Sequence, residues 1–335
     1  MDLASSDNRI ARTLRLVSRY ANVWVLPLLF RTLTFTSPDQ VMRVASTLLP
    51  KRRIHIPALK SNLHTFPRVL SSYTIESLAL VVNNRLPSVE IALAKIAPAF
   101  TQLKNLVISS SNLSANAHWL RQHPIYPTNI MILHFGSPCR VNYRDPVFQH
   151  ATHLYVSSME GHRNSFVTDA PQLTHLAMHT RITHPFWVMT NFATIFLDLL
   201  KKTPRLELFV FVLNSDDIYD PKIDQWTLAL SECLQDQRFV VLPHFRHPRM
   251  EWERMLSGKD SIWDCALTWR ALLQGGHIHE ILRYRTEMAE ELRAESELLS
   301  AKKYAVDWEI DLVQREGYLP YQGDLTERRE AARLY

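Results

Sequence analysis

The chain has 335 residues, of which 46% are hydrophobic and 21% are charged, so it can bury a sizeable core and is not disordered by composition. Its formal net charge of +5 is mild for this length and does not by itself indicate a nucleic-acid partner. It holds only 7 glycines, the first at Gly136, whereas a phosphate-binding loop needs several closely spaced glycines, so the common types of nucleotide enzyme are close to excluded.

Short apolar segments rich in β-branched and aromatic residues recur along the chain, and each is followed by a helical stretch. Six of them fit one template, apolar-x-x-apolar-x-apolar, with their fourth positions at Leu78, Leu106, Leu133, Leu154, Leu176 and Phe209. These positions lie 28, 27, 21, 22 and 33 residues apart, which is typical of leucine-rich repeats. A strand that returns after one helical connection pairs with the previous strand, so the spacing predicts a parallel ladder. Phe30–Phe35 and Phe239–Leu242 are expected as irregular first and last strands.

The connecting segments carry apolar stripes with helical spacing. Ser37–Gln40 has the sequence of a capping box with proline at the first helical position, and Val41 and Leu48 follow on one face. Similar stripes occupy residues 89–100 and 195–200, and plain core packing explains all of them. We therefore expect an α/β fold: a curved, leucine-rich-repeat-like solenoid with a mostly parallel strand ladder and outer helices.

The pattern changes from about Pro248 onwards. A helix is predicted to open at Ser261–Asp264 and to end near Gly275. A long amphipathic helix follows, either as a cap on the solenoid or as a coiled-coil-like seam, and the charged Glu295 and Lys302 within its apolar stripe favour the cap. The predicted division is an N-terminal helical segment at 1–36, a repeat region at 37–248, and a C-terminal helical cap and tail at 249–335.

Cysteine usage and the N-terminal sequence bear on the compartment. Cys139, Cys233 and Cys265 form no short-spaced pair, which favours reduced, intracellular thiols over a disulfide framework. The first residues are polar and acidic, unlike a signal peptide, and the apolar run Val23–Phe30 is too short to span a bilayer. We therefore expect a protein of the cytoplasm or nucleus with no membrane partner.

Histidines are the residue type that merits a catalytic argument. In the template, the fourth and sixth positions point into the core under the helices, and the third, fifth and seventh face the other, open side of the sheet. His153 and His175 take the third position of consecutive strands, which would place them about 5 Å apart. His134, Tyr155 and His179 are expected around them.

Two hypotheses of different classes follow from this cluster. The histidines could ligate zinc or act as acid and base in a metal-dependent enzyme. However, no Asp or Glu occupies an open-side position to orient a histidine or to complete a hydrolytic water site. We therefore predict a binding surface for a protein client, with no catalytic residue, metal or cofactor. Polyanion binding through short basic clusters such as Lys51–Arg53 is a third, weaker hypothesis, and nucleic acid is not the expected partner.

Residues 13–36 carry a family resemblance. Leu16–Arg19, then Val25–Leu29, then the strand-like Arg31–Phe35 resemble the second half of an F-box followed by a first repeat. This arrangement is similar to that of fungal (basidiomycete-type) F-box-like proteins with degenerate leucine-rich repeats. Such proteins often end their repeats with segments like Arg238–Pro243, so the resemblance covers residues 9–270 on loose hydrophobic patterns.

The resemblance implies a substrate-recognition subunit of a cullin-type ubiquitin ligase. The open sheet face would bind the client, and the N-terminal segment would dock the ligase adaptor through Leu16, Val17, Trp24 and Leu28. Only Met1–Ile10 precede the match, and the first F-box helix with its Leu-Pro pair is missing. We therefore expect weak or no adaptor binding, either because the chain is a truncated product of a longer gene or because that function is lost. Alternatively, residues 9–30 are a helical cap for the repeats.

Overall fold

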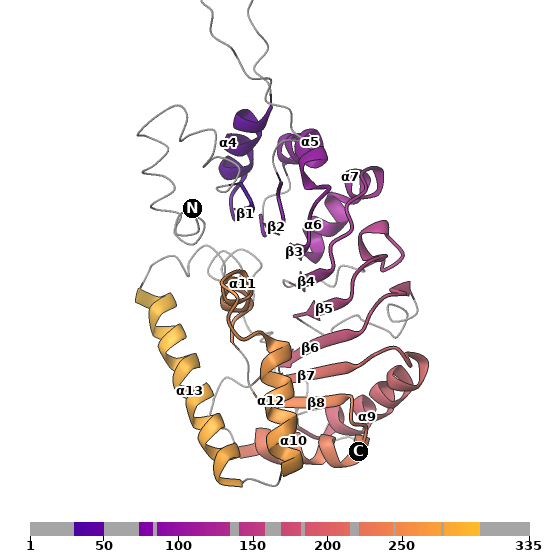
Figure 1. Ribbon diagram of the computed structural model, residues 1–335, viewed down its shortest axis with the longest axis vertical. Coiled ribbons are helices and arrows are strands. Elements are labelled where there is room, and N and C mark those ends of the chain that lie inside the picture. The colour runs from indigo at the N-terminus through magenta and orange to yellow at the C-terminus, as the bar shows by residue number, and fades with distance from the viewer. Residues whose placement is uncertain are drawn as a thin grey trace, which may run out of the picture.

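A computed structural model describes residues 30–49, 74–82, 86–134, 141–157, 169–181, 185–214, 221–243, 246–275 and 278–301. Eight strands in this part of the chain form one sheet, all parallel, and follow one another across it in chain order (Figure 1). Their bounds are Thr32–Phe35 (β1), Ser77–Leu80 (β2), Asn105–Ser109 (β3), Asn129–Leu133 (β4), His153–Val156 (β5), His175–Arg181 (β6), Leu208–Asn214 (β7) and Phe239–Pro243 (β8). The predicted parallel ladder is confirmed, and the fold is α/β.

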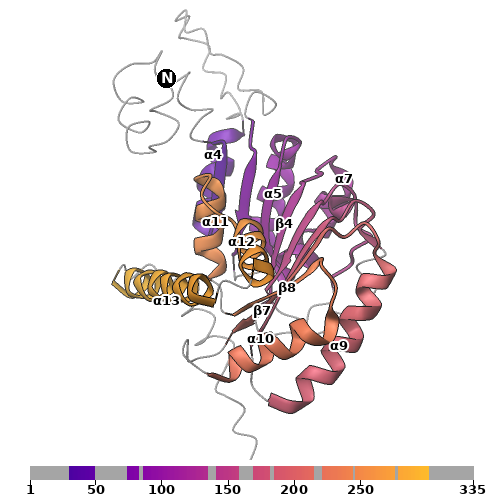
Figure 2. The same cartoon turned by 60° about the horizontal axis from the view of Figure 1, so that its bottom comes forward.

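Helices lie on both sides of this sheet (Figure 2). The outer side, as we call it, faces α4, α5, α7, α9 and α10, and the inner side faces α11, α12 and α13 (Figure 1). The helix bounds are Pro38–Leu48 (α4), Pro87–Ile96 (α5), Ser110–Ala115 (α6), Ala117–Gln122 (α7), Pro185–Lys202 (α9), Pro221–Leu234 (α10), Pro248–Leu256 (α11), Ile262–Gly275 (α12) and Ile278–Ala301 (α13), with short 3₁₀ turns at Ala97–Phe100 and Pro146–Phe148. Many of these elements begin with proline, whose fixed φ suits a first helical position.

The outer core lies between the sheet and the outer helices. Leu78, Leu106, Leu154 and Leu176 stand at equivalent register positions on β2, β3, β5 and β6 and are buried in one cluster. The apolar faces of the helices complete this cluster with Val41 and Leu48 of α4, Val89, Leu93 and Ile96 of α5, and Phe196 and Leu199 of α9. The prediction that the template leucines share one core under the helices is therefore confirmed for these strands.

Strand β4 is shifted from its predicted register. Ile130, and not Leu133, stands beside Leu106 and Leu154. Residues 130–133 are all buried because β4 is covered on both sides, so alternation of apolar and polar residues gave no signal for the register. The correction brings Asn129 and Met131 to the inner side of the sheet and removes His134 from the series of inner-side residues.

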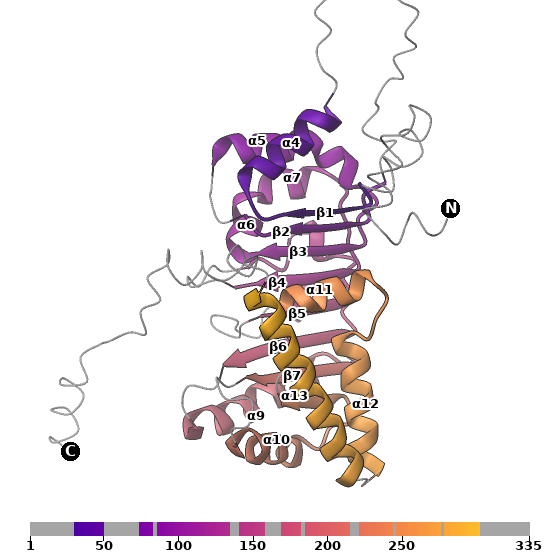
Figure 3. The ribbon, with the colours of Figure 1, turned by 90° about the vertical axis from the view of Figure 1, so that its left-hand side faces the viewer.

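A second, inner core lies between the sheet and the C-terminal helices. Val210 and Val240 of the sheet pack with Trp252 of α11 and Trp269 of α12, and all four are buried. The helices α11, α12 and α13 lie in front of β4 to β8, whereas β1 to β3 extend beyond them (Figure 3). The sequence led us to expect an open sheet on this side. That expectation is wrong: the chain's own C-terminal helices cover β4 to β8, and the inner-side residues Ala79 of β2 and Val107 of β3 are also buried in the inner core.

Helix α12 begins where the sequence predicts. Asp264 accepts hydrogen bonds from the backbone N–H of Ser261 (2.9 Å) and from its hydroxyl (2.6 Å) at the start of α12. The long helix α13 packs along α12 and places Tyr284 and Met288 against the inner core. None of the described helices combines the length and the apolar composition needed to cross a membrane.

Candidate binding site

A row of polar side chains crosses the inner side of the sheet near the start of the strands; we call it the polar row. Its members are neighbours in register on β2 to β6: Ser77, Asn105, Asn129, His153 and His175. The amide nitrogen of Asn105 donates to the hydroxyl of Ser77 (3.0 Å), and that of Asn129 donates to the amide oxygen of Asn105 (2.7 Å). Ser77, Asn105 and Asn129 therefore form a hydrogen-bonded chain across β2, β3 and β4.

The polar row ends in two stacked imidazole rings. His153 and His175 are paired in register, and their ring centroids lie 4.2 Å apart with 17° between the planes. The indole of Trp263 meets both rings edge-on, at 5.3 Å from His153 and 5.5 Å from His175. The predicted proximity of the two histidines is confirmed, and α12 supplies the aromatic residue that covers them.

Threonine hydroxyls fix the orientation of both rings. Oγ1 of Thr152 lies 2.9 Å from Nδ1 of His153, and Oγ1 of Thr174 lies 2.8 Å from Nδ1 of His175. Whichever partner donates, Nδ1 is engaged in each ring. Among the described residues Nε2 of neither ring has a hydrogen-bond partner, so Nε2 is the nitrogen left to contact a ligand.

Burial keeps this pair uncharged at neutral pH. Desolvation, together with a smaller contribution from the neighbouring His175, lowers the pKa of His153 to about 4. Desolvation also lowers the pKa of His175, although the carboxylate of Glu207 opposes the change. Two neutral rings can donate or accept hydrogen bonds, but they do not act as a charged acid near pH 7.

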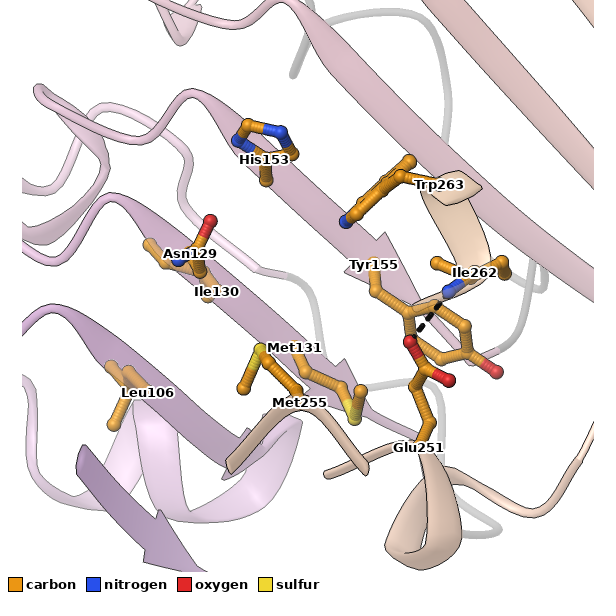
Figure 4. Close-up of a pocket in the computed structure, with 10 residues that line it drawn as sticks. All are labelled: Leu106, Asn129, Ile130, Met131, His153, Tyr155, Glu251, Met255, Ile262 and Trp263. Carbon is orange, nitrogen blue, oxygen red and sulfur yellow. Dashed lines mark hydrogen bonds between the residues drawn. The ribbon is translucent and has the colours of Figure 1, made fainter. Parts of the chain in front are cut away.

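A pocket opens beside the polar row, between the sheet and helices α11 and α12 (Figure 4). Its empty space, including the part open to solvent, is about 330 Å³. The walls are mainly apolar, and the residues that line the pocket are Leu106, Asn129, Ile130, Met131, His153, Tyr155, Glu251, Met255, Ile262 and Trp263.

Glu251 is the acidic residue of this pocket, and its carboxylate is already engaged. Oε1 accepts a hydrogen bond from the backbone N–H of Ile262 (2.7 Å), drawn in Figure 4, and Oε2 pairs with the guanidinium of Arg246 at 3.2 Å. Burial raises the pKa of Glu251, while the Ile262 N–H and Arg246 oppose the rise. With both oxygens occupied, Glu251 fixes the start of α12 and is not free to take a proton from a ligand.

The structure separates the five residues expected to form one cluster. His179 lies on β6 four residues beyond His175, a distance of about 13 Å along a strand, and His134 follows the end of β4. Tyr155 faces the inner side as predicted but is only 3% exposed, so it is part of the pocket wall. No group of three or more His, Cys, Asp or Glu side chains is arranged to hold a metal ion within the described ranges.

Other residues of the site were missed from the sequence. Asn129 was overlooked because β4 was aligned three residues too late, and aligning Ile130 with Leu106 would have placed it beside Asn105. Met255, Ile262 and Trp263 come from helices that fold back onto the sheet, and no local signal indicates such a return. The predicted adaptor-binding residues Leu16, Val17, Trp24 and Leu28 lie outside the residues that the structure describes.

The chain has no match among models of protein families, among curated proteins or among solved structures. The likeness to F-box-like proteins therefore stays a resemblance carried by the sequence patterns quoted above.

Proposed function

We propose that the protein is a non-catalytic protein-interaction module built on a degenerate leucine-rich-repeat-like solenoid. The observation that carries this proposal is the pocket beside the polar row, which combines apolar walls with uncharged hydrogen-bonding groups. A small apolar hollow next to fixed polar groups is typical of the anchor sites at protein interfaces.

The regular succession of strands supports the repeat architecture. With Ile130 in its observed register, the equivalent positions from Leu78 to Phe239 are 22 to 33 residues apart, and each unit adds one strand beside the last. Repeat proteins of this kind bind partners over a continuous surface built from equivalent positions on successive units. The polar row occupies such a set of equivalent positions.

The chemistry of the site favours binding over catalysis. The two imidazoles are neutral near pH 7, and the pocket's carboxylate is held by Arg246 and by the backbone of Ile262. A hydrolytic site would need a free base or a metal-bound water. The rings of His153 and His175 instead stack on each other against Trp263, an arrangement suited to contact with another aromatic or amide group.

The family resemblance suggests the biological setting of this module. We propose that it recognises a client for a cullin-type ubiquitin ligase, in the cytoplasm or the nucleus, with adaptor binding through the segment around Leu16 and Trp24. An adaptor pull-down with residues 1–335, beside the same chain carrying an added upstream helix with a Leu-Pro pair, tests that part. Capture by neither chain would remove the ligase role and leave an interaction scaffold.

Site-specific photo-crosslinking tests the binding proposal. A photoreactive amino acid replaces Asn129 in the polar row, and a matched control replaces the exposed Ser46 on α4. We expect a discrete protein adduct in cells from position 129 and none from position 46. Stoichiometric zinc in the purified protein, lost in the His153→Ala/His175→Ala double variant, would overturn the proposal in favour of a metal-dependent enzyme.

A further inference from the structure

We infer that the pocket between β4, β5 and helices α11 and α12 binds one aliphatic side chain, leucine or methionine, of an extended peptide segment in the partner. This inference rests on the proposed function, because it names the part of the client that the module recognises. It goes further by assigning separate roles to the pocket walls and to its polar rim.

The walls of the pocket suit a flexible aliphatic group. Met131 and Met255 face each other from the sheet and from α11, and Ile262 and Trp263 close the side formed by α12 (Figure 4). Methionine side chains adapt their shape to an inserted group at little cost, and this is why they are frequent at binding surfaces. Met255 and Trp263 are partly exposed, so the pocket can be reached from solvent.

The size of the pocket limits the occupant. Its empty space of about 330 Å³ includes the part open to solvent, so the enclosed part is much smaller and has no room for a cofactor. A charged side chain is disfavoured, because Glu251 is neutralised by Arg246 and both of its oxygens are engaged. An uncharged aliphatic side chain is therefore the group that fits both the volume and the electrostatics.

The rim of the pocket complements a peptide backbone. Trp263 directs its indole nitrogen toward the space beside His153 and Asn129. The amide oxygen of Asn129 borders the same space (Figure 4). Among the described residues neither of these two atoms has a hydrogen-bond partner. A peptide unit presents one carbonyl acceptor and one N–H donor, and this rim offers one donor, the indole N–H, and one acceptor, the amide oxygen. An extended segment can therefore be held by its backbone while its side chain fills the pocket.

Methyl NMR of the full chain tests the inference with a defined probe. The chain has 9 methionines, so a spectrum of methyl-labelled methionine is simple enough to follow Met131 and Met255. The probe is N-acetyl-leucine N-methylamide, which carries one leucine side chain between two amides. The matched control is N-acetyl-glycine N-methylamide, which has the same backbone without the side chain.

We expect the leucine probe to shift the Met131 and Met255 methyl signals with saturation in the millimolar range, as is usual for so small a ligand. Met42, which is exposed on α4, should not respond. Met255→Trp fills the pocket from a partly exposed position and should weaken binding at least about tenfold, whereas Leu267→Trp on the exposed face of α12 should not. The methyl signal of Met178, which is 1% exposed in the outer core, reports in the ligand-free spectrum that each variant is folded.

Two results would overturn the inference. They are equal shifts with the glycine control, or no shift of Met131 and Met255 up to the solubility limit of the leucine probe. If the probe fails while position 129 still crosslinks to a protein, the pocket assignment falls and the proposed function stands. If the probe binds while no protein adduct forms at position 129, the pocket assignment stands and the proposed function falls.

Discussion

Arg246 and Glu251 form an ion pair in which the two side chains are only 5% and 4% exposed. Arg246 also donates to the backbone carbonyl of Asp260 at 2.9 Å, and Glu251 accepts from the N–H of Ile262. The pair therefore joins the segment before α11 to the start of α12. It fixes the two helices that cover the inner side of the sheet and form one wall of the pocket.

Breaking this pair should be costly. Arg246→Met leaves the Glu251 carboxylate buried without its partner, and we expect a loss of about 3–5 kcal/mol in the free energy of unfolding, measured by urea denaturation. The control is Arg249→Met, which removes the i,i+4 pair with the exposed Glu253 and should cost less than about 1 kcal/mol. Equal effects of the two substitutions would contradict the structural role of the buried pair.

The stacked histidines predict a pH dependence of stability. The folded protein holds the pKa of His153 near 4, below the ordinary value of 6.5, so between these values the unfolded chain binds more protons. Stability from this source is complete above pH 6.5 and is lost as the pH falls toward 4. The lowered pKa of His175 acts in the same direction.

Thermal melts at pH 7, 6 and 5 measure this effect. The melting temperature of the wild type should fall more steeply with pH than that of the His153→Asn/His175→Asn double variant, because the variant has no group to protonate at these positions. His118→Asn, at an exposed position on α7, serves as the control and should keep the wild-type slope. A double variant with an unchanged slope would rule out the buried pair as the cause.

Truncating a side chain should lower the free energy of unfolding far more in the outer core than on an exposed helix face. Leu154→Ala removes a fully buried side chain at the centre of the ladder, and we expect a loss of about 2–5 kcal/mol in the free energy of unfolding. Ile91→Ala, on the exposed face of α5, should change stability by less than about 0.5 kcal/mol. Guanidinium denaturation of the two variants distinguishes these cases, and a mild Leu154 variant would argue against a shared core.

The inner core makes a parallel prediction for the C-terminal helices. Trp252→Ala creates a cavity between α11 and the sheet, and we expect a loss of about 3–5 kcal/mol together with exposure of apolar surface. Binding of the dye ANS at moderate temperature reports that exposure. If the variant is as stable as the wild type and binds no dye, α11 does not belong to the core.

Much of the sheet was predictable because each strand has one strongly apolar face. Leu106, Leu154 and Leu176 occupy equivalent template positions, and a period of two residues then fixes which neighbours face the helices. The same logic paired His153 with His175. It failed at β4, where apolar residues on both faces hide the alternation and where the template fits best three residues later than the observed register.

The pocket was not predictable from the strands alone, because four of its ten lining residues come from α11 and α12. The contact of Trp263 with His153 depends on the return of α12 across the sheet. The sequence indicates that α12 is a helix, but its apolar residues do not say which surface they cover. An open face was expected because the position of α11 and α12 could not be inferred. The apolar inner-side residues Val210 and Val240 are a sign in the strands that something covers this side.

The path of the chain has a consequence for how the molecule unfolds. Each strand of the ladder pairs with the strands before and after it in the chain, so local opening could begin at either end of the sheet. The C-terminal helices, however, bridge β4 to β8 and tie the last described part of the chain to its middle (Figure 3). Backbone amides of β5 to β8 should therefore exchange with deuterium as one cooperative unit, and those of β1 and β2 should open earlier and independently.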